Sequence, residues 1–154
     1  ESEQMYGDKG EVPEGEYVLP IGVADVKREG TDVTIVSFGK IIKEAFKAAD
    51  ELEKENISCE IIDLRTVRPL DINTILKSVK KTNRLVILEE AWPFGNVSTE
   101  ITYQVQEKAF DYLDAPVQKI NTADTPAPYS PVLLAEWLPN SNDVVKAVKK
   151  VLYK

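Results

Sequence analysis

The sequence predicts an α/β domain of three layers, in which helices cover both faces of a mostly parallel β-sheet. Short β-branched apolar runs alternate along the chain with longer stretches whose apolar residues recur every three to four positions. These are the patterns of buried strands and of amphipathic helices. Segment 63–71 joins one of each, because it follows the apolar run 59–62, carries two arginines in a polar turn, stops at Pro69 and opens a helix at Asp71. Strand, turn and helix in this order form the unit of a parallel sheet.

The elements follow in chain order. Residues 1–16 mix glycine, proline and acids without periodicity, which predicts a linker or arm. Residues 17–21 are apolar but contain Pro20, so they form at best an edge segment, and residues 23–28 alternate loosely. Strands are expected at residues 32–38, 58–64, 84–88 and 116–120, and the apolar runs 32–38 and 59–62 indicate buried strands. Helices are expected at residues 41–52, at 71–79 with Asp71 as cap, at 97–113, and from a cap at Ser141 or Asn142 to Leu152. Loops are expected at residues 92–96 and 125–131.

Size, composition and charge exclude several classes of protein. With 154 residues the chain can form one domain that buries roughly 70% of its unfolded surface. Its 43% hydrophobic and 29% charged residues are typical of soluble globular proteins, and no apolar run is long enough for a membrane span. The net charge of −7 argues against nucleic acid, and the single cysteine suits a reducing compartment. The opening residues carry neither a secretory signal nor an initiator methionine, which suggests a piece of a longer chain.

Candidate catalytic chemistry is sparse. The chain has no histidine, and the turn after strand 32–38 carries the single glycine Gly39, so dinucleotide and Walker-type fingerprints are missing. Gly39 either opens an anion site at a helix N-terminus or permits a tight turn. Glu89 and Glu90 end a strand and could divide acid–base work, but without histidine or metal-ligand spacing a structural role is favoured. Cys59 lies in an apolar strand and is expected to behave as a small hydrophobe.

Arginines and loop aromatics each have two interpretations. Arg65 and Arg68 either fork onto a carboxylate or phosphate, or pair with Asp63 or Asp71 to brace the loop, which is favoured. Large aromatic residues in the expected loops anchor either loop packing or interfaces: Trp92, Phe94 and Trp137. Residue patterns alone therefore predict an α/β domain without a convincing active site, as expected for part of a larger enzyme.

Five segments occur in an order that resembles one known family. They are Asp63-Leu-Arg-Thr-Val-Arg-Pro-Leu-Asp71, Ser78-Val-Lys-Lys-Thr-Asn-Arg-Leu-Val86, Glu89-Glu-Ala-Trp-Pro93, Leu113-Asp-Ala-Pro116 and Asp124-Thr-Pro-Ala-Pro-Tyr-Ser130. Together they resemble the C-terminal domain of the β subunit of the decarboxylating component of pyruvate dehydrogenase, a thiamine-diphosphate enzyme of the transketolase group. The resemblance implies a transketolase-like C-terminal domain at residues 17–154. Residues 1–16 would be the linker from a preceding pyrimidine-binding domain that this sequence does not contain.

The resemblance also implies where the cofactors lie. In this family the thiamine ring and its activating glutamate belong to the preceding domain, and the α subunit holds the diphosphate and magnesium. No catalytic, cofactor-binding or metal-binding residue is therefore expected in this chain, and the isolated domain is expected to be inactive. The whole enzyme decarboxylates pyruvate and reductively acetylates lipoyl groups. The domain is expected to pack β subunits together in an α2β2 tetramer and to help dock the subunit-binding domain of the lipoyl acyltransferase, in the bacterial cytoplasm or the mitochondrial matrix.

By resemblance, two sets of residues become candidates. The candidates for subunit interfaces are Arg65, Arg68, Trp92, Phe94 and Tyr129. For acyltransferase docking, Asp114 and the final carboxylate on Lys154 would face a basic partner, unless Asp114 only braces the turn before Pro116. The β subunits of branched-chain 2-oxo acid and acetoin dehydrogenases remain alternatives. A different class of protein, an autonomous α/β module with a small anion at the edge of Gly39 and Arg65, also remains open.

Overall fold

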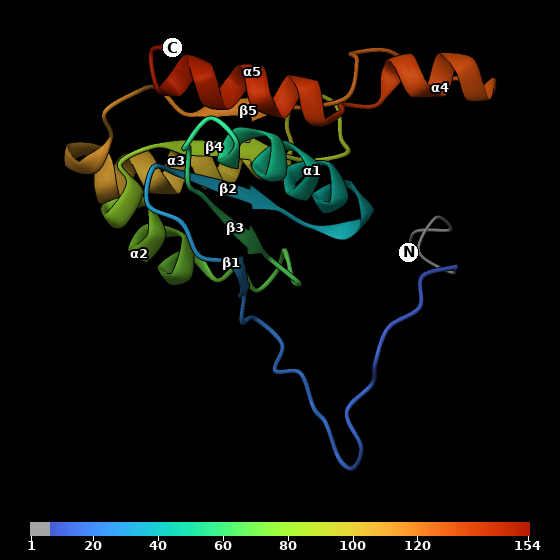
Figure 1. Ribbon diagram of the computed structural model, residues 1–154, viewed down its shortest axis with the longest axis horizontal. Helices are drawn as coiled ribbons and strands as arrows, with labels where there is room; N and C mark the ends of the chain where they lie inside the picture. The colour runs from blue at the N-terminus through green and yellow to red at the C-terminus, as the bar shows by residue number, and fades with distance from the viewer. Residues whose placement is uncertain (1–6) are drawn as a thin grey trace.

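The computed structural model describes residues 7–154 of the chain, and its helices and strands alternate along the sequence (Figure 1). The strands are β1 (Asp25–Arg28), β2 (Val33–Ser37), β3 (Cys59–Asp63), β4 (Leu85–Leu88) and β5 (Gln118–Ile120). The α-helices are α1 (Ile42–Glu53), α2 (Ile72–Thr82), α3 (Val97–Ala109), α4 (Pro131–Trp137) and α5 (Ser141–Val151). Short 3-10 helices η2 (Gly39–Ile41) and η3 (Phe110–Tyr112) precede α1 and follow α3. All four predicted strands are confirmed.

The five strands form one sheet in the order β1-β3-β2-β4-β5. Strands β2 to β5 are parallel, and β1 pairs with β3 in the antiparallel direction at one side. In the register, Ser37 lies opposite both Asp63 and Leu88, and Leu88 lies opposite Ile120. The four parallel strands therefore end level with one another. We call their C-terminal ends, with the loops that follow them, the carboxyl edge, and it is here that ligands usually bind in open α/β sheets.

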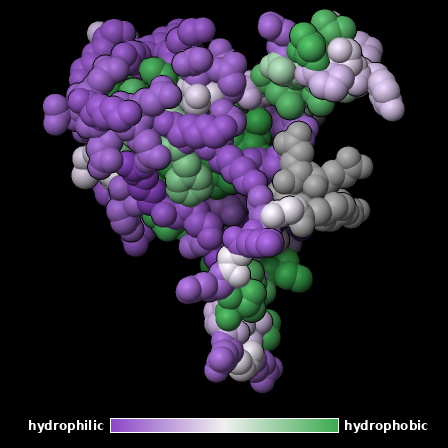
Figure 2. Space-filling view, turned by 45° about the vertical axis from the view of Figure 1, so that its right-hand side comes forward, coloured by the Kyte–Doolittle hydropathy of each residue, from purple (hydrophilic) through white to green (hydrophobic). Residues whose placement is uncertain are grey.

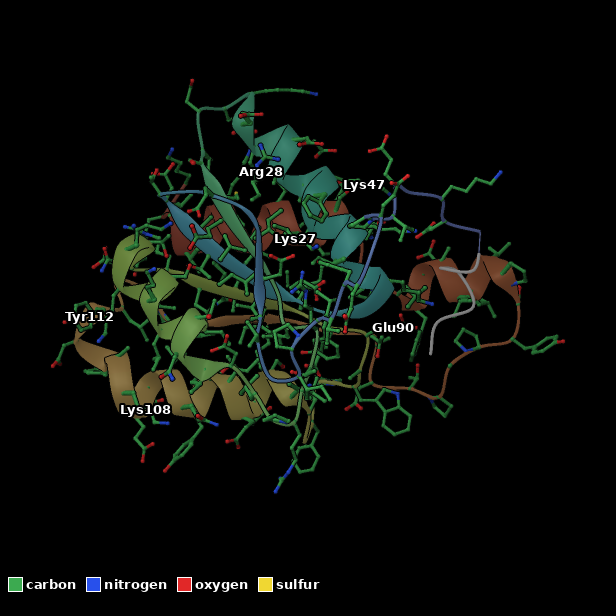
Figure 3. All side chains as sticks on the ribbon, turned by 90° about the horizontal axis from the view of Figure 1, so that it is seen from below. Lys27, Arg28, Lys47, Glu90, Lys108 and Tyr112 are labelled. Atoms are coloured by element: carbon green, nitrogen blue, oxygen red, sulfur yellow. The ribbon has the colours of Figure 1, made fainter. Side chains whose placement is uncertain are left out.

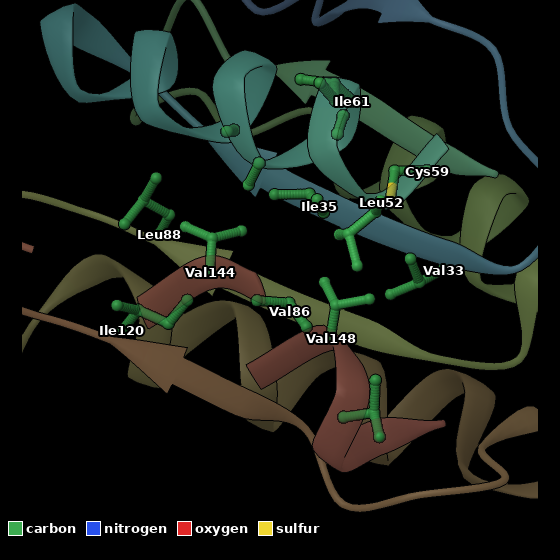
Figure 4. Close-up of a cluster of buried hydrophobic side chains, with 14 of the residues drawn as sticks. Val33, Ile35, Leu52, Cys59, Ile61, Val86, Leu88, Ile120, Val144 and Val148 are labelled. Carbon is green, nitrogen blue, oxygen red and sulfur yellow. The ribbon is translucent and has the colours of Figure 1, made fainter. Parts of the chain in front are cut away.

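Two hydrophobic cores lie on the two faces of the sheet, and this confirms the three-layer architecture. Helices α1 and α5 cover one face, where Leu52 and Val148 pack over Ile35 (Figure 4). Helices α2 and α3 cover the other face, where Ile75 and Ile101 belong to the second core. Burial of each such side chain contributes about 1.5–3 kcal/mol. Strands β2 and β4 are buried along their whole length, and this explains their largely apolar sequences.

Three details differ from the expectations. The proline-rich loop ends one residue before Pro131, which begins the short helix α4. The cap of α5 is Asn140 rather than Ser141 or Asn142, because the Asn140 side chain and Asp143 form a reciprocal capping box. The helix predicted at residues 97–113 changes to a 3-10 turn after Ala109. By contrast, Asp71 caps α2 as predicted, with its Oδ1 accepting from the N–H of Thr74 at 3.2 Å.

The N-terminal arm, residues 7–22, projects from the domain and contains no helix or strand (Figure 1). Lys43 pairs with Asp8 at 2.6 Å, and the N–H of Gly22 donates to Thr66 Oγ1 at 3.1 Å. Between these contacts the arm is exposed, and Figure 2 shows hydrophobic surface along it. Its exposed large apolar residues are Val12, Tyr17, Val18, Leu19 and Ile21. Residues 1–6 of the predicted linker lie outside the described residues. Among residues 7–154, no helix is long and apolar enough to cross a membrane.

Candidate interaction sites

Two loops at the carboxyl edge are tied together by both tryptophans. The indole Nε1–H of Trp92, in the loop after β4, donates to the backbone O of Thr125 at 3.0 Å. The Nε1–H of Trp137, at the end of α4, donates to the same oxygen at 2.9 Å. The loop between β5 and α4 is thus held on two sides through one carbonyl. Tryptophan side chains used in this way act as loop anchors, and their remaining ring surface stays available for contacts.

The loop at residues 92–96 is fixed but bears exposed aromatic rings. Lys119 Nζ donates to the backbone O of Pro93 at 2.9 Å, and the Asn96 side chain donates to the backbone O of Trp92. Asn96 also caps α3 by accepting from the N–H of Thr99 at 3.0 Å. Despite this support, Trp92 is 53% exposed and Phe94 is 90% exposed. A rigid loop with bare aromatic rings fits an interface better than loop packing alone.

Glu89 is fully buried at the carboxyl end of β4. Its Oε2 accepts from the N–H of Ser98 in the first turn of α3 at 2.8 Å. Its Oε1 is also buried and receives no hydrogen bond from any residue that the structure describes. Burial raises the pKa of Glu89, and the N–H of Ser98, the charge of Lys119 and the N–H of Val97 counteract only part of this effect. The ionised side chain therefore costs folding free energy.

Glu89→Gln is expected to raise the Tm of the chain by about 2–4 °C at neutral pH, since a neutral amide is less costly to bury than a carboxylate. A raised folded-state pKa means that the charge of Glu89 destabilises the fold above that pKa. The cost fades as pH falls toward the unfolded value of 4.5. The increase in Tm caused by Glu89→Gln should therefore shrink as pH falls over the same range. Circular dichroism melts at pH 4 to 8 measure it, with the half-exposed Glu90→Gln as control, and a shift independent of pH would contradict the assignment.

Arg65 and Arg68 also lie at the carboxyl edge, after β3, but their predicted pairing is wrong in part. Arg65 donates from its guanidinium to Asp25 of β1 at 2.6 Å, and only its backbone N–H reaches Asp63, at 3.0 Å. Asp71 is occupied instead by the N–H of Ala24 at 3.0 Å and by Thr74. Arg65 thus braces β1 against β3, while Arg68 is exposed.

Three further residues follow strands at the carboxyl edge: Gly39 after β2, Glu90 after β4 and the interface candidate Tyr129 after β5. Tyr129 is fully exposed in the loop before α4. Glu90 pairs with Lys40 at 3.2 Å beside η2, and Figure 3 shows it at this side of the molecule, away from Tyr112. Gly39 opens η2 with φ of 67°, which explains the glycine as a requirement of the turn. The acidic pair therefore separates, with Glu89 in the core and Glu90 at the surface.

The acyltransferase-docking candidate Asp114 lies at a second site, near the amino ends of β4 and β5. The backbone N–H of Asp114 donates to the backbone O of Asn83 at 2.9 Å, and the Asp114 carboxylate pairs with Arg84 at 3.2 Å. The hydroxyl of Tyr153 donates to the backbone O of Asp114 at 3.1 Å, and Arg84 Nε donates to the backbone O of Val151 at 3.0 Å. The end of α5 is thus bound to the Asp114 turn, and the side chain of Asp114 remains 55% exposed.

Sequence reasoning did not identify Arg84 and Tyr153 as members of this site. Each contacts Asp114 from a distant position in the chain, and no local pattern marks such a pair. Both interpretations of Asp114 describe part of the structure, because Asp114 is braced through its backbone and half-exposed through its carboxylate. Lys154 is exposed one residue beyond Tyr153.

Residues 7–154 hold no group of three or more histidine, cysteine, aspartate or glutamate side chains that could bind a metal ion. Burial raises the pKa of the Cys59 thiol to about 12, which keeps this side chain in the neutral form of a small hydrophobe.

Comparisons with known proteins agree with these features. Residues 22–144 match the family described as "Transketolase, C-terminal domain". The chain is 50% identical over 153 residues to the pyruvate dehydrogenase E1 component subunit beta of Rickettsia felis, over 99% of this chain and 47% of the relative. It is 43% identical over 152 residues to the acetoin:2,6-dichlorophenolindophenol oxidoreductase subunit beta of Bacillus subtilis, over 99% and 44%. A solved structure described as "Split gene transketolase, inactive beta4 tetramer" superposes with a TM-score of 0.78 and 29% identity, over 94% of this chain and 46% of that chain. The chain spans about half the length of these relatives.

Proposed function

We propose that this chain, which belongs to the transketolase C-terminal domain family, is the C-terminal domain of the β subunit of a pyruvate dehydrogenase E1 component. The observation that carries the proposal is the 50% identity to such a subunit over nearly the whole chain. The acetoin oxidoreductase subunit is a weaker candidate at 43% identity. In this proposal residues 17–154 are the domain and residues 1–16 connect it to a pyrimidine-binding domain. The compartment would be the bacterial cytoplasm or the mitochondrial matrix.

The proposal places thiamine diphosphate and magnesium in other parts of the enzyme. The whole enzyme would decarboxylate pyruvate and pass the acetyl group to lipoyl groups. This chain would contribute assembly and docking. Its support is the exposed aromatic rings at the carboxyl edge and the half-exposed carboxylate of Asp114 at a separate surface.

A calorimetric titration tests this division. The isolated chain is expected to show no heat of binding with thiamine diphosphate and magnesium up to millimolar concentrations, because the groups that would hold them lie in other domains. The full-length β subunit with its α subunit should reduce 2,6-dichlorophenolindophenol with pyruvate and much less with acetoin. Micromolar binding of the cofactor to the isolated chain, or a preference for acetoin, would sink the proposal.

The carboxyl edge is the proposed subunit interface of an α2β2 assembly. Trp92, Phe94 and Tyr129 would bury their exposed rings there, with Arg65 and Arg68 at the next strand end. Exposed aromatic residues on fixed loops are the usual energetic centres of interfaces. The assembly of the solved relative as a tetramer is compatible with such a role.

The Asp114 surface is the proposed docking site for the subunit-binding domain of the lipoyl acyltransferase. The half-exposed carboxylate of Asp114 would face a basic partner, with Lys154 at the side of the contact. The hydroxyl of Tyr153 donates to the backbone O of Asp114, which supports a joint site for Asp114 and the residues beside Tyr153. The nearby cation Arg84 already pairs with Asp114, so the partner would share the carboxylate rather than meet a free charge.

Asp114→Asn in the full E1 component is expected to weaken acyltransferase binding by about 1 kcal/mol and to slow association, since exposed charges act mainly on encounter. The dependence of the association rate on salt should flatten, because screening acts over about 8 Å at physiological ionic strength. Surface plasmon resonance at several salt concentrations measures both. Asp111→Asn, an exposed acid in η3, is the matched control. Dye reduction should stay unchanged, and normal docking in the Asp114 variant would rule this surface out.

A further inference from the structure

A hollow of about 540 Å³ opens at the carboxyl edge, beside the loop at residues 92–96. Apolar side chains form much of its wall: Phe38, Trp92, Phe94 and Val97. Glu89 is the buried member of the lining. Its Oε1 is the side-chain oxygen that accepts no hydrogen bond from the described residues. An unpaired buried carboxylate oxygen beside an apolar hollow calls for a hydrogen-bond donor.

The charge of the lining is one-sided. Three carboxylates, those of Glu89, Glu90 and Glu100, belong to it, and the lining includes no lysine or arginine. Lys40, which does not line the hollow, pairs with Glu90 and so compensates one of the three carboxylates. Lys119 donates to Pro93 O and to Thr99 Oγ1, and its charge offsets part of that of Glu89, so among the described residues Glu100 is the carboxylate of the lining without a nearby cation. The hollow therefore keeps a negative potential and suits a cationic group.

The walls favour one kind of cation. Trp92 is held by its hydrogen bond to Thr125, so its ring keeps one orientation, and Phe94 stands almost fully exposed beside it. Aromatic faces attract cations, and tryptophan does so most strongly. A planar guanidinium can stack on such rings and donate to several carboxylate oxygens at once, whereas an ammonium group is compact and strongly hydrated. Charge and shape thus agree on an arginine side chain.

We propose that this hollow receives an arginine side chain from the adjoining subunit, which stacks on Trp92, pairs with Glu100 and is attracted by the buried charge of Glu89 behind the wall. The inference rests on the proposed function, because it takes the carboxyl edge to be a subunit interface. It adds the chemistry of the partner and a role for Glu89. Glu89 then keeps its unfavourable burial in the free chain because the charge is compensated in the assembly.

Charge reversal on α3 tests the proposal in the full-length β subunit mixed with its α subunit. Glu100→Lys is expected to weaken assembly at least about tenfold in sedimentation velocity, since a like charge would face the arginine. Glu107→Lys is the matched control, because Glu107 is exposed on the same helix two turns later and does not line the hollow. It should change assembly less than about twofold. Glu89→Gln should weaken assembly although it raises the Tm of the free subunit, a combination that a purely structural role would not produce.

Trp92→Ala distinguishes the subunit interface from the arginine site. Unchanged tetramers in Trp92→Ala would overturn both together. Weakened tetramers in Trp92→Ala with normal assembly in Glu100→Lys and Glu89→Gln would overturn the arginine site and leave the interface standing. Equal loss in Glu100→Lys and Glu107→Lys would also overturn it, because the effect would then be general repulsion. Far-ultraviolet circular dichroism of each variant confirms that the fold is intact.

Discussion

Gly30→Ala is expected to destabilise the chain by at least about 3 kcal/mol, because the added methyl group would overlap backbone atoms of a central strand. Gly30 is buried in the connection between β1 and β2. A Cβ added to it would lie 2.2 Å from the backbone carbon of Cys59, 2.2 Å from the backbone nitrogen of Glu60 and 2.6 Å from the carbonyl oxygen of Cys59. These atoms belong to β3, the strand between β1 and β2, and cannot retreat without breaking the sheet.

Urea unfolding followed by circular dichroism measures this loss. Gly10→Ala is the control, because its Cβ would meet nothing within 4 Å. It should change the free energy of unfolding by less than about 0.5 kcal/mol. A Gly30→Ala variant as stable as the Gly10→Ala variant would show that the connection is looser than its contacts indicate.

Lys81→Met is expected to cost about 2 kcal/mol at neutral pH, because it leaves the buried carboxylate of Glu60 without its cation. Glu60 is 2% exposed, and its Oε2 accepts from Lys81 Nζ and from the N–H of Gly30. Lys81 also donates to Glu29 at 3.0 Å. This free-energy cost is smaller than for a fully buried ion pair because the Lys81 side chain is 41% exposed and its charge is partly screened by solvent.

The effect of Lys81→Met depends on pH through the titration of Glu60. Burial alone would raise the pKa of Glu60, but its hydrogen bonds, that from Lys81 first, hold the pKa below the ordinary value of 4.5. Its contribution to stability is present above pH 4.5 and is lost as pH falls through the lowered value. The hydrogen bond to Glu60 raises the pKa of Lys81, so the lysine keeps its contribution across neutral pH.

The difference between Lys81→Met and the parent chain should therefore shrink in acid. Thermal melts at about pH 3 and about pH 7 measure the change. Lys146→Met is the control, because the Lys146 side chain is 78% exposed and its Nζ lies as far as 3.6 Å from the Asp143 carboxylate, so this ion pair is weak. A loss of equal size at both pH values would mean that the aliphatic part of Lys81, rather than its charge, provides the stability.

Most of the fold could be predicted from the sequence because the inner strands are buried on both faces. Such strands are largely apolar and β-branched, and residues 33–37 and 85–88 have almost no other interpretation. The cap of α2 was also predictable, because Asp71 follows a proline and precedes an apolar stripe. Helix α4 was missed because it spans seven residues, buries none of them and starts within a proline-rich segment. Its pattern carries no periodic signal.

The sites were less predictable because they depend on contacts between distant residues. Arg65 finds its partner Asp25 forty positions away, although Asp63 and Asp71 are closer in sequence. The position of Glu89 at a strand end was visible, but the fact that one of its oxygens is buried without a partner was not. The aromatic loop residues were predicted as anchors, and Trp92 and Trp137 do anchor one carbonyl. Sequence reasoning could not have found that they share it.

This shared carbonyl means that the tryptophan fluorescence of the chain comes from one place in the structure. The sequence contains two tryptophans, and both indoles donate to Thr125 O, outside the two hydrophobic cores. Tryptophan emission therefore reports mainly on the loops beyond the sheet. An unfolding curve recorded by fluorescence would follow the release of these loops, while one recorded by circular dichroism follows the helices. The two tryptophans thus serve as an intrinsic fluorescent label for the surface that we propose meets the neighbouring subunit.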